Sequence, residues 1–123
     1  MKTSERYPVT QGDVIVNAAS TLFDRTEITA PILTADVYCG DILDSKTFAL
    51  FDSADADAGK PIINLSNMSA SGVPKTLVIV DRHVVITDFA LRAKDAASKK
   101  AALEALTASG DIRLAVNADY FKV

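Results

Sequence analysis

The chain has 123 residues, a formal net charge of −3, 49% hydrophobic and 7% aromatic residues, and no tryptophan. This length predicts one domain with its own hydrophobic core. The slightly acidic balance excludes a typical nucleic-acid binder, which needs a basic face, and the apolar runs are far shorter than the roughly 20 residues that span a bilayer.

The first twelve residues are polar and show no apolar periodicity. Pro8 and Gly12 interrupt them, and no apolar run follows of the kind that a signal peptide requires, so we expect synthesis in the cytoplasm. We predict a flexible N-terminal arm over residues 1–12 and a single β-rich domain over residues 13–123. The alternative for the arm is an ordinary frayed terminus without a role.

Short apolar runs separated by polar turns predict the next elements. Pro31 limits one run to an edge strand or an extended connection, and Gly40 and Asp41 place a turn or bulge inside another. Pro61 stands at the first position of a third run, where its missing backbone donor costs least. The predicted strands cover residues 14–16, 28–33, 37–43, 48–51 and 61–65.

The most regular part of the chain is the stretch of residues 75–116. Apolar runs at 76–80 and 84–86 flank a short polar segment, which predicts two strands joined as a pair. Asp95 is a suitable N-cap for an alanine-rich helix with a narrow apolar stripe. Gly110 fits the left-handed position after the end of that helix.

A closing strand is predicted at residues 112–116. Together these elements predict an α+β fold. It is a compact, β-rich single domain of short strands, barrel-like or sandwich-like, with one main helix near the C-terminus and an extended N-terminal arm.

One cysteine and one histidine limit the available chemistry. Cys39 lies in an apolar stretch, cannot form an intramolecular disulfide, and is expected to be a small buried side chain rather than a catalytic thiolate. His83 follows Asp81 by two residues, so a strand would place both on one face, and the two could form an acid–base dyad. We favour a hairpin-tip or edge-strand pair, because nothing nearby supplies a nucleophile or a glycine-rich oxyanion loop.

The acidic residues favour turns over catalysis or metal binding. Residues 52–59 resemble a calcium loop, but the glycine and glutamate positions of an EF-hand do not match, which predicts a solvated acidic loop. Asp36, Asp41 and Asp44 surround the predicted strand 37–43; paired carboxylates serve glycosidases, yet the aromatic residues of a sugar site are missing. We therefore predict no catalytic residues, no metal site and no cofactor, and a protein that is not an enzyme.

Four stretches, in order, carry a resemblance. They are a polar arm leading into residues 12–16; Ala30-Pro31-Ile32-Leu33 followed by 37–43; 61–65 followed by 77–80 and 84–85; and the helix 96–108 followed by Gly110-Asp111-Ile112-Arg113. This order resembles the head decoration proteins of lambda-type tailed phages, which cap and reinforce the expanded capsid. The resemblance covers most of the chain, from residue 12 to 116. It departs at Asp111 and in the tail at residues 120–123.

The resemblance implies a homotrimer on the outer surface of the virion head that binds the major capsid protein. It would stabilise the shell against internal DNA pressure, without nucleic-acid or membrane partners. The arm would add backbone hydrogen bonds to an exposed capsid strand. The predicted capsid-binding residues are Lys2, Thr3, Ser4, Glu5, Arg6, Tyr7, Pro8, Val9 and Thr10. The alternative function is another small virion component, such as a tail or head-completion protein.

Overall fold

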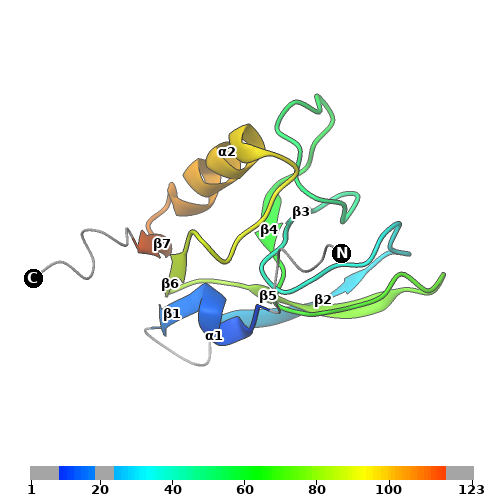
Figure 1. The fold of residues 1–123 in the computed structure, drawn as a ribbon, viewed down its shortest axis with the longest axis horizontal. Helices are drawn as coiled ribbons and strands as arrows, with labels where there is room; N and C mark the ends of the chain where they lie inside the picture. Colours follow the sequence, from blue (N-terminus) through cyan, green and yellow to red (C-terminus); the bar gives the residue numbers. More distant parts are fainter. Residues whose placement is uncertain (1–8, 19–23, 116–123) are drawn as a thin grey trace, which may run out of the picture.

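A computed structural model describes residues 9–18 and 24–115 of the chain (Figure 1). The described residues form two helices and seven short strands. In chain order these are α1 (Gln11–Val14), β1 (Ile15–Ala18), β2 (Arg25–Ala30), β3 (Ile42–Asp44), β4 (Pro61–Ile63), β5 (Lys75–Val80), β6 (Val84–Thr87), α2 (Ala96–Thr107) and β7 (Ile112–Ala115).

The largest sheet has three strands in the order β1-β6-β7. β1 pairs antiparallel with β6, and β7 pairs parallel with it, so that Val84–Thr87 oppose Ile112–Ala115. Parallel neighbours need a long crossover connection, and α2 lies within the connection between β6 and β7. Figure 1 shows α2 above these strands at one end of the molecule. The helix is therefore held over the sheet that its own flanking strands build.

The predicted pairing of the runs at 76–80 and 84–86 is wrong. β5 pairs antiparallel with β2, from Arg25 opposite Val80 to Ala30 opposite Lys75, whereas β6 belongs to the three-stranded sheet. His83, in the turn between β5 and β6, has a φ of 62°. This left-handed conformation, uncommon outside glycine, turns the chain from one sheet into the other instead of closing a hairpin.

The third sheet pairs β3 with β4. The predicted strand 37–43 is shorter than expected, since only its end lies in β3, and Gly40 takes a φ of 96° in the preceding turn. The predicted strand 48–51 is wrong: Phe48 has a φ of 60°, and only Leu50 makes an isolated bridge, to Leu43. The α+β, β-rich class with one main C-terminal helix is confirmed. Over the described residues, the three small sheets do not close into a barrel.

Two apolar clusters fill the interior. The first joins the three-stranded sheet to α2 and contains Ile86 and Ala102, both fully buried. The second lies under the β2–β5 pair, around Leu77. Cys39 is buried in the first cluster, which confirms its predicted role as a small core residue.

Helix α2 begins and ends on the predicted signals. The Asp95 carboxylate accepts a hydrogen bond from the Ser98 backbone N–H at 2.8 Å. Gly110 has a φ of 86°, and its N–H donates to the Thr107 carbonyl. On the inward face Ser98 and Ala102 are buried, and Leu103 and Leu106 pack partly buried against the first cluster. Within the described ranges, no helix has the length and apolar character to cross a membrane.

The Asp95 cap predicts a pH-dependent contribution to stability. The Ser98 backbone N–H lowers the pKa of Asp95 below its ordinary value of 3.8. Because the folded pKa is the lower one, the stabilisation is complete above the unfolded pKa and is lost as the pH falls through the folded pKa. We expect Asp95→Ala to lower the Tm at neutral pH, and the difference from wild type to shrink towards about pH 2. Calorimetry of both proteins across this range tests it; a difference independent of pH would contradict it.

Candidate functional site

The first described residues belong to the body of the domain. Val9 is partly buried against the first cluster. Thr10 caps α1 in a reciprocal capping box: its hydroxyl accepts the Asp13 N–H at 3.3 Å, and the Asp13 carboxylate accepts the Thr10 N–H at 2.9 Å. This box explains why Val14, predicted to open a strand, instead closes a helical turn, and why β1 begins at Ile15.

Long-range contacts fix this helical turn to distant parts of the chain. The Gln11 side-chain amide donates to the Leu65 carbonyl at 3.3 Å, and the Thr87 hydroxyl donates to the Asp13 carbonyl. Val14 has no exposed surface. We call residues 9–14 the anchored junction. The chain therefore joins the domain at a defined point, upstream of the predicted boundary between residues 12 and 13.

The anchored junction contains two of the predicted capsid-binding residues, Val9 and Thr10. The others, Lys2, Thr3, Ser4, Glu5, Arg6, Tyr7 and Pro8, lie outside the described residues. Sequence reasoning missed that Val9 packs against the core and that Thr10 caps α1. The available signal was Thr10 with Asp13 three residues later, a variant of the capping-box pattern.

The two residues considered as an acid–base dyad lie on an exposed turn. Asp81 and His83 are both exposed between β5 and β6. The argument for a dyad required an alternating strand that places both side chains on one face. The positive φ of His83 removes that premise, because the segment is not extended there.

The acidic loop at 52–59 is built from tight turns. Asp52 and Asp55 each accept a backbone N–H two residues further on, from Ala54 and Asp57. Such side chain–backbone bonds are typical of Asx turns. Among the described residues, no three of the His, Cys, Asp and Glu side chains gather closely enough to hold a metal ion.

Asp41, predicted to be an acidic turn residue, is instead a buried structural carboxylate. Only 1% of it is exposed. Arg92 binds it through both of its oxygens, at 2.9 and 3.0 Å, and the Tyr38 N–H donates to it at 3.0 Å. This pairing raises the pKa of Arg92. The Arg92 guanidinium also lies 5.9 Å from the centre of the Tyr38 ring, so one arginine fixes the turn before β3 to the segment before α2.

Asp44 has a similar structural role. Both of its oxygens accept the Gly59 N–H at 3.0 Å, and one accepts the Lys46 N–H at 2.7 Å. A Cβ at Gly59 would lie only 2.6 Å from the Ser45 hydroxyl, so glycine is required for this close approach. Asp41 and Asp44 thus stabilise the loops around β3, and neither is presented on the surface as a catalytic group.

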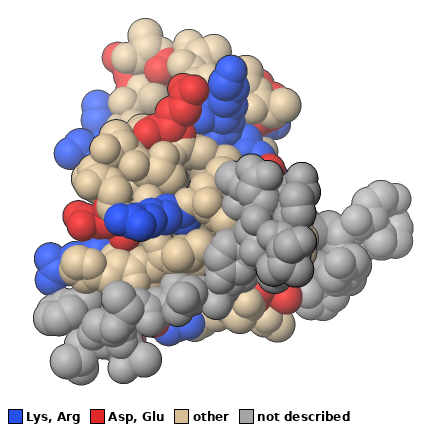
Figure 2. All heavy atoms as spheres, turned by 90° about the vertical axis from the view of Figure 1, so that its left-hand side faces the viewer, with Lys and Arg blue, Asp and Glu red and all other residues tan. Residues whose placement is uncertain are grey.

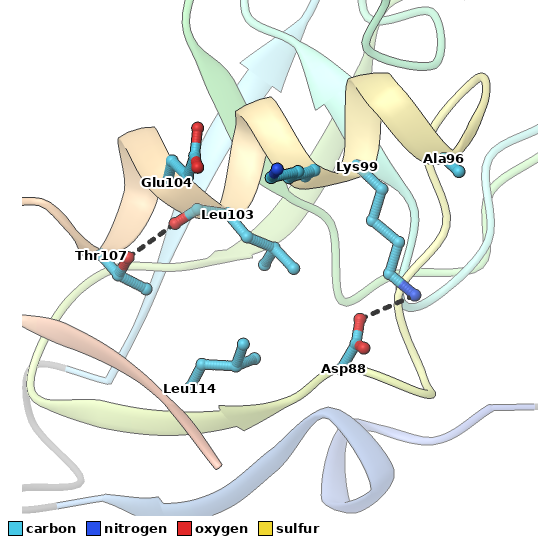
Figure 3. Close-up of a pocket in the computed structure, with 8 residues that line it drawn as sticks. Asp88, Ala96, Lys99, Leu103, Glu104, Thr107 and Leu114 are labelled. Atoms are coloured by element: carbon cyan, nitrogen blue, oxygen red, sulfur yellow. Dashed lines mark hydrogen bonds and ion pairs between the residues drawn. The ribbon is translucent and has the colours of Figure 1, made fainter. Parts of the chain in front are cut away.

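A groove of about 400 Å³ separates α2 from the edge of the three-stranded sheet (Figure 3). Leu103 points from α2 towards Leu114 of β7, and both are partly buried. Lys99 reaches across to Asp88 at 2.9 Å and closes one end. We call this feature the α2–β7 groove. It combines an apolar floor with a charged rim.

The side of the molecule turned to the left in Figure 1 is shown in Figure 2. Acidic and basic side chains are interspersed there with uncharged surface. Charge of one sign does not gather over the described part of this face. The candidate surfaces are therefore the anchored junction and the α2–β7 groove.

No protein-family model, no curated protein and no solved structure matches the chain.

Proposed function

We propose that this chain is a capsid decoration protein of a tailed phage. In this proposal a homotrimer binds the outer surface of the expanded head, contacts the major capsid protein through residues 2–10, and stabilises the shell against internal DNA pressure. The observation that carries the proposal is the anchored junction, because it attaches a polar segment to a fixed point of a compact β-rich body. The order of predicted strands and helix supports it further.

The segment before the junction has the properties of a strand that is completed by a partner. It is polar and has no apolar face of its own, so burial cannot offset the entropy of ordering it. Pairing with the exposed edge of a partner sheet would supply the missing backbone hydrogen bonds. Extended at about 3.3 Å per residue, residues 2–8 would reach roughly 23 Å from the body. In that conformation Tyr7 would face one side, and Arg6 and Pro8 the other.

The anchored junction would transmit this attachment to the whole domain. A strand added to the capsid would be connected through the Thr10 cap to α1, and from α1 to the Leu65 carbonyl and to β6 through Thr87. Three such arms on one trimer would bind with a high effective concentration. Capsid stabilisation is then mechanical, because detachment requires several strand contacts to break together.

Removal of residues 1–8 is expected to abolish binding to expanded capsids. The cut leaves Val9 and Thr10 in place, so the folded body should be preserved, which circular dichroism and thermal unfolding would check. Co-sedimentation with expanded, DNA-free capsids of lambda-type phages measures binding. The full chain should pellet and the shortened chain should stay in the supernatant. Equal pelleting of the two proteins would overturn the assignment of the site to the arm.

Proline substitution separates strand addition from a simple charge contact. Alternate residues of an added strand direct their N–H groups to the partner, so one of Ser4→Pro and Glu5→Pro should weaken binding at least about tenfold while the other has less effect. The matched controls Ser4→Ala and Glu5→Ala keep the backbone donor and should bind nearly as well as wild type. Loss of binding in Glu5→Ala alone would point to a charge contact instead.

The tail or head-completion alternative differs in assembly. Light scattering on the purified full chain should give the mass of a trimer or a monomer for a decoration protein. Assembly into larger rings or tubes, together with failure to bind any expanded shell, would replace the decoration proposal with the tail or head-completion one.

A further inference from the structure

We propose that copies of this chain associate head to tail, with the exposed end of the β2–β5 pair of one protomer inserted into the α2–β7 groove of the next. We call this end the apolar tip and define it by four exposed residues, Pro31, Ile32, Val73 and Pro74. The contact does not depend on capsid binding. Only the number of copies in the assembly, three, rests on the proposed function.

The apolar tip lies just beyond the last pair of the β2–β5 ladder, in which Ala30 is opposite Lys75. Ile32 is 54% exposed and Val73 is 52% exposed. Large aliphatic side chains that are exposed together at one end of a ladder indicate a contact surface. The two prolines of the tip lack a backbone donor, so this end is poorly suited to strand addition and offers its side chains instead.

The loops behind the tip hold it in a fixed shape. Val37 and Met68 exchange backbone hydrogen bonds at 2.9 Å. The Asp36 carboxylate accepts the Ala70 N–H, also at 2.9 Å, and Leu33 is buried in the second cluster. Because the tip is already ordered in the protomer, its insertion into a groove costs little conformational entropy.

The α2–β7 groove offers an apolar floor of suitable size. Leu103 and Leu114 face each other there, and the described residues bury both only in part. The groove volume of about 400 Å³ lies in the range of pockets that hold small ligands, and the ends of two aliphatic side chains need less space. The groove can therefore take Ile32 and Val73 together.

The two surfaces lie at opposite ends of the molecule. Figure 1 shows α2 and β7 on one side and the beginning of β5, next to the tip, on the other. A protomer therefore cannot fill its groove with its own tip. A surface and its complement on one chain fit a heterologous contact with a second copy, and such contacts close into a ring when the rotation between neighbours allows it.

The charges beside the two surfaces are complementary. Lys100 and Glu104 are exposed on the rim of the groove, and Asp36 and Lys75 flank the tip. None of the four forms a salt bridge with another described residue. A head-to-tail contact can pair Lys75 with Glu104 and Asp36 with Lys100. Complementary charges of this kind fix the orientation of partners and disfavour other arrangements.

The small size of the tip predicts that a single contact is weak. A stable interface uses roughly 20–30 residues on each side, and the tip supplies only a few of these. In a closed ring every protomer makes two contacts, one through its tip and one through its groove. We therefore expect association that depends steeply on protein concentration and yields a ring of three with little dimer.

Analytical ultracentrifugation of the full chain over a concentration series tests this association. The wild-type chain should shift from monomer to trimer as its concentration rises. Ile32→Asp and Val73→Asp change exposed positions, so they should keep the fold and weaken association at least about tenfold. Ala54→Asp adds the same charge at an exposed position outside both surfaces and should associate like wild type. A full chain that stays monomeric up to its solubility limit, or tip variants that associate as well as Ala54→Asp, would overturn the proposal.

Disulfide trapping tests which surfaces meet. Chains carrying Val73→Cys and chains carrying Leu103→Cys are mixed and oxidised with glutathione disulfide, while the native Cys39 is buried. The mixture should give a cross-linked dimer with one chain of each kind. The matched control, Ala54→Cys mixed with Leu103→Cys, should give little. Absence of the mixed dimer, or cross-linking of Val73→Cys chains to each other at the same rate, would contradict a tip-in-groove contact.

These measurements separate the contact from the proposed function. Neither uses a capsid, and no variant alters residues 2–10. Loss of the contact with capsid binding retained would remove only this inference. Association in solution without binding to any expanded shell would remove the decoration function and leave the head-to-tail contact in place.

Discussion

Arg92→Met is expected to lower the free energy of unfolding by about 3 kcal/mol. The substitution keeps most of the apolar stem but removes the guanidinium from a carboxylate that is only 1% exposed. Breaking a buried ion pair by removing one partner costs roughly 3–5 kcal/mol. We place the effect at the lower end because the Arg92 side chain is 39% exposed, which allows water to reach the Asp41 oxygens. Urea denaturation measures the change.

Two controls separate geometry from charge in this pair. Arg92→Lys keeps the positive charge but cannot form both hydrogen bonds to Asp41, so it should lose roughly half as much stability. Lys94→Ala removes an exposed ion pair, to Asp52, and should have no measurable effect. If Arg92→Met unfolded at the same urea concentration as Lys94→Ala, the Asp41–Arg92 pair would not be a stabilising element.

Ile86→Ala is expected to lower the free energy of unfolding by about 4 kcal/mol. Ile86 has no exposed surface and lies in the central strand, paired with Ile15 on one side and Leu114 on the other. Truncation would leave a cavity bounded on both sides by neighbouring strands, which leaves little room for collapse.

Two matched substitutions test whether the loss of stability depends on the volume removed and on the burial of the side chain. Ile86→Val removes a single methylene group and should cost about 1 kcal/mol. Val85→Ala alters the adjacent, half-buried position in the same strand and should cost less than Ile86→Ala. Equal losses for Val85→Ala and Ile86→Ala would mean that burial in the central strand does not determine the result.

Features that depend on neighbouring residues were predictable from the sequence. Asp95 caps α2, Gly110 adopts a left-handed conformation, and Pro61 opens β4. Each of these is decided within a few residues, by a cap hydrogen bond, by the absence of a Cβ, or by a missing backbone donor. Pattern reasoning works at this range because the cause and its effect lie in the same segment.

Features that depend on distant partners were not predictable. The sequence indicated that β5 and β6 are strands, but it did not indicate that β5 pairs with β2 and β6 with β1 and β7. A β5–β6 hairpin and the observed pairings satisfy the same apolar pattern. Asp41 resembled a turn residue, since its partner Arg92 is distant in the sequence. The α2–β7 groove likewise needs Leu103 and Leu114 from separate elements. Of the candidate capsid-binding residues, the structure describes only Val9 and Thr10, so the role of the arm stays a prediction.

The position of β6 between β1 and β7 has a consequence for synthesis on the ribosome. Ile15 in β1 pairs with Ile86 in β6, about 70 residues later in the chain. The other edge of β6 finds its partner only when β7 has been synthesised. The three-stranded sheet that contains the N-terminal strand β1 therefore cannot be complete before residues 112–115 have been synthesised. Contacts this far apart slow folding and leave strand edges open in the meantime. We therefore expect this sheet to form late during synthesis of the domain, after residues 112–115 have left the ribosome.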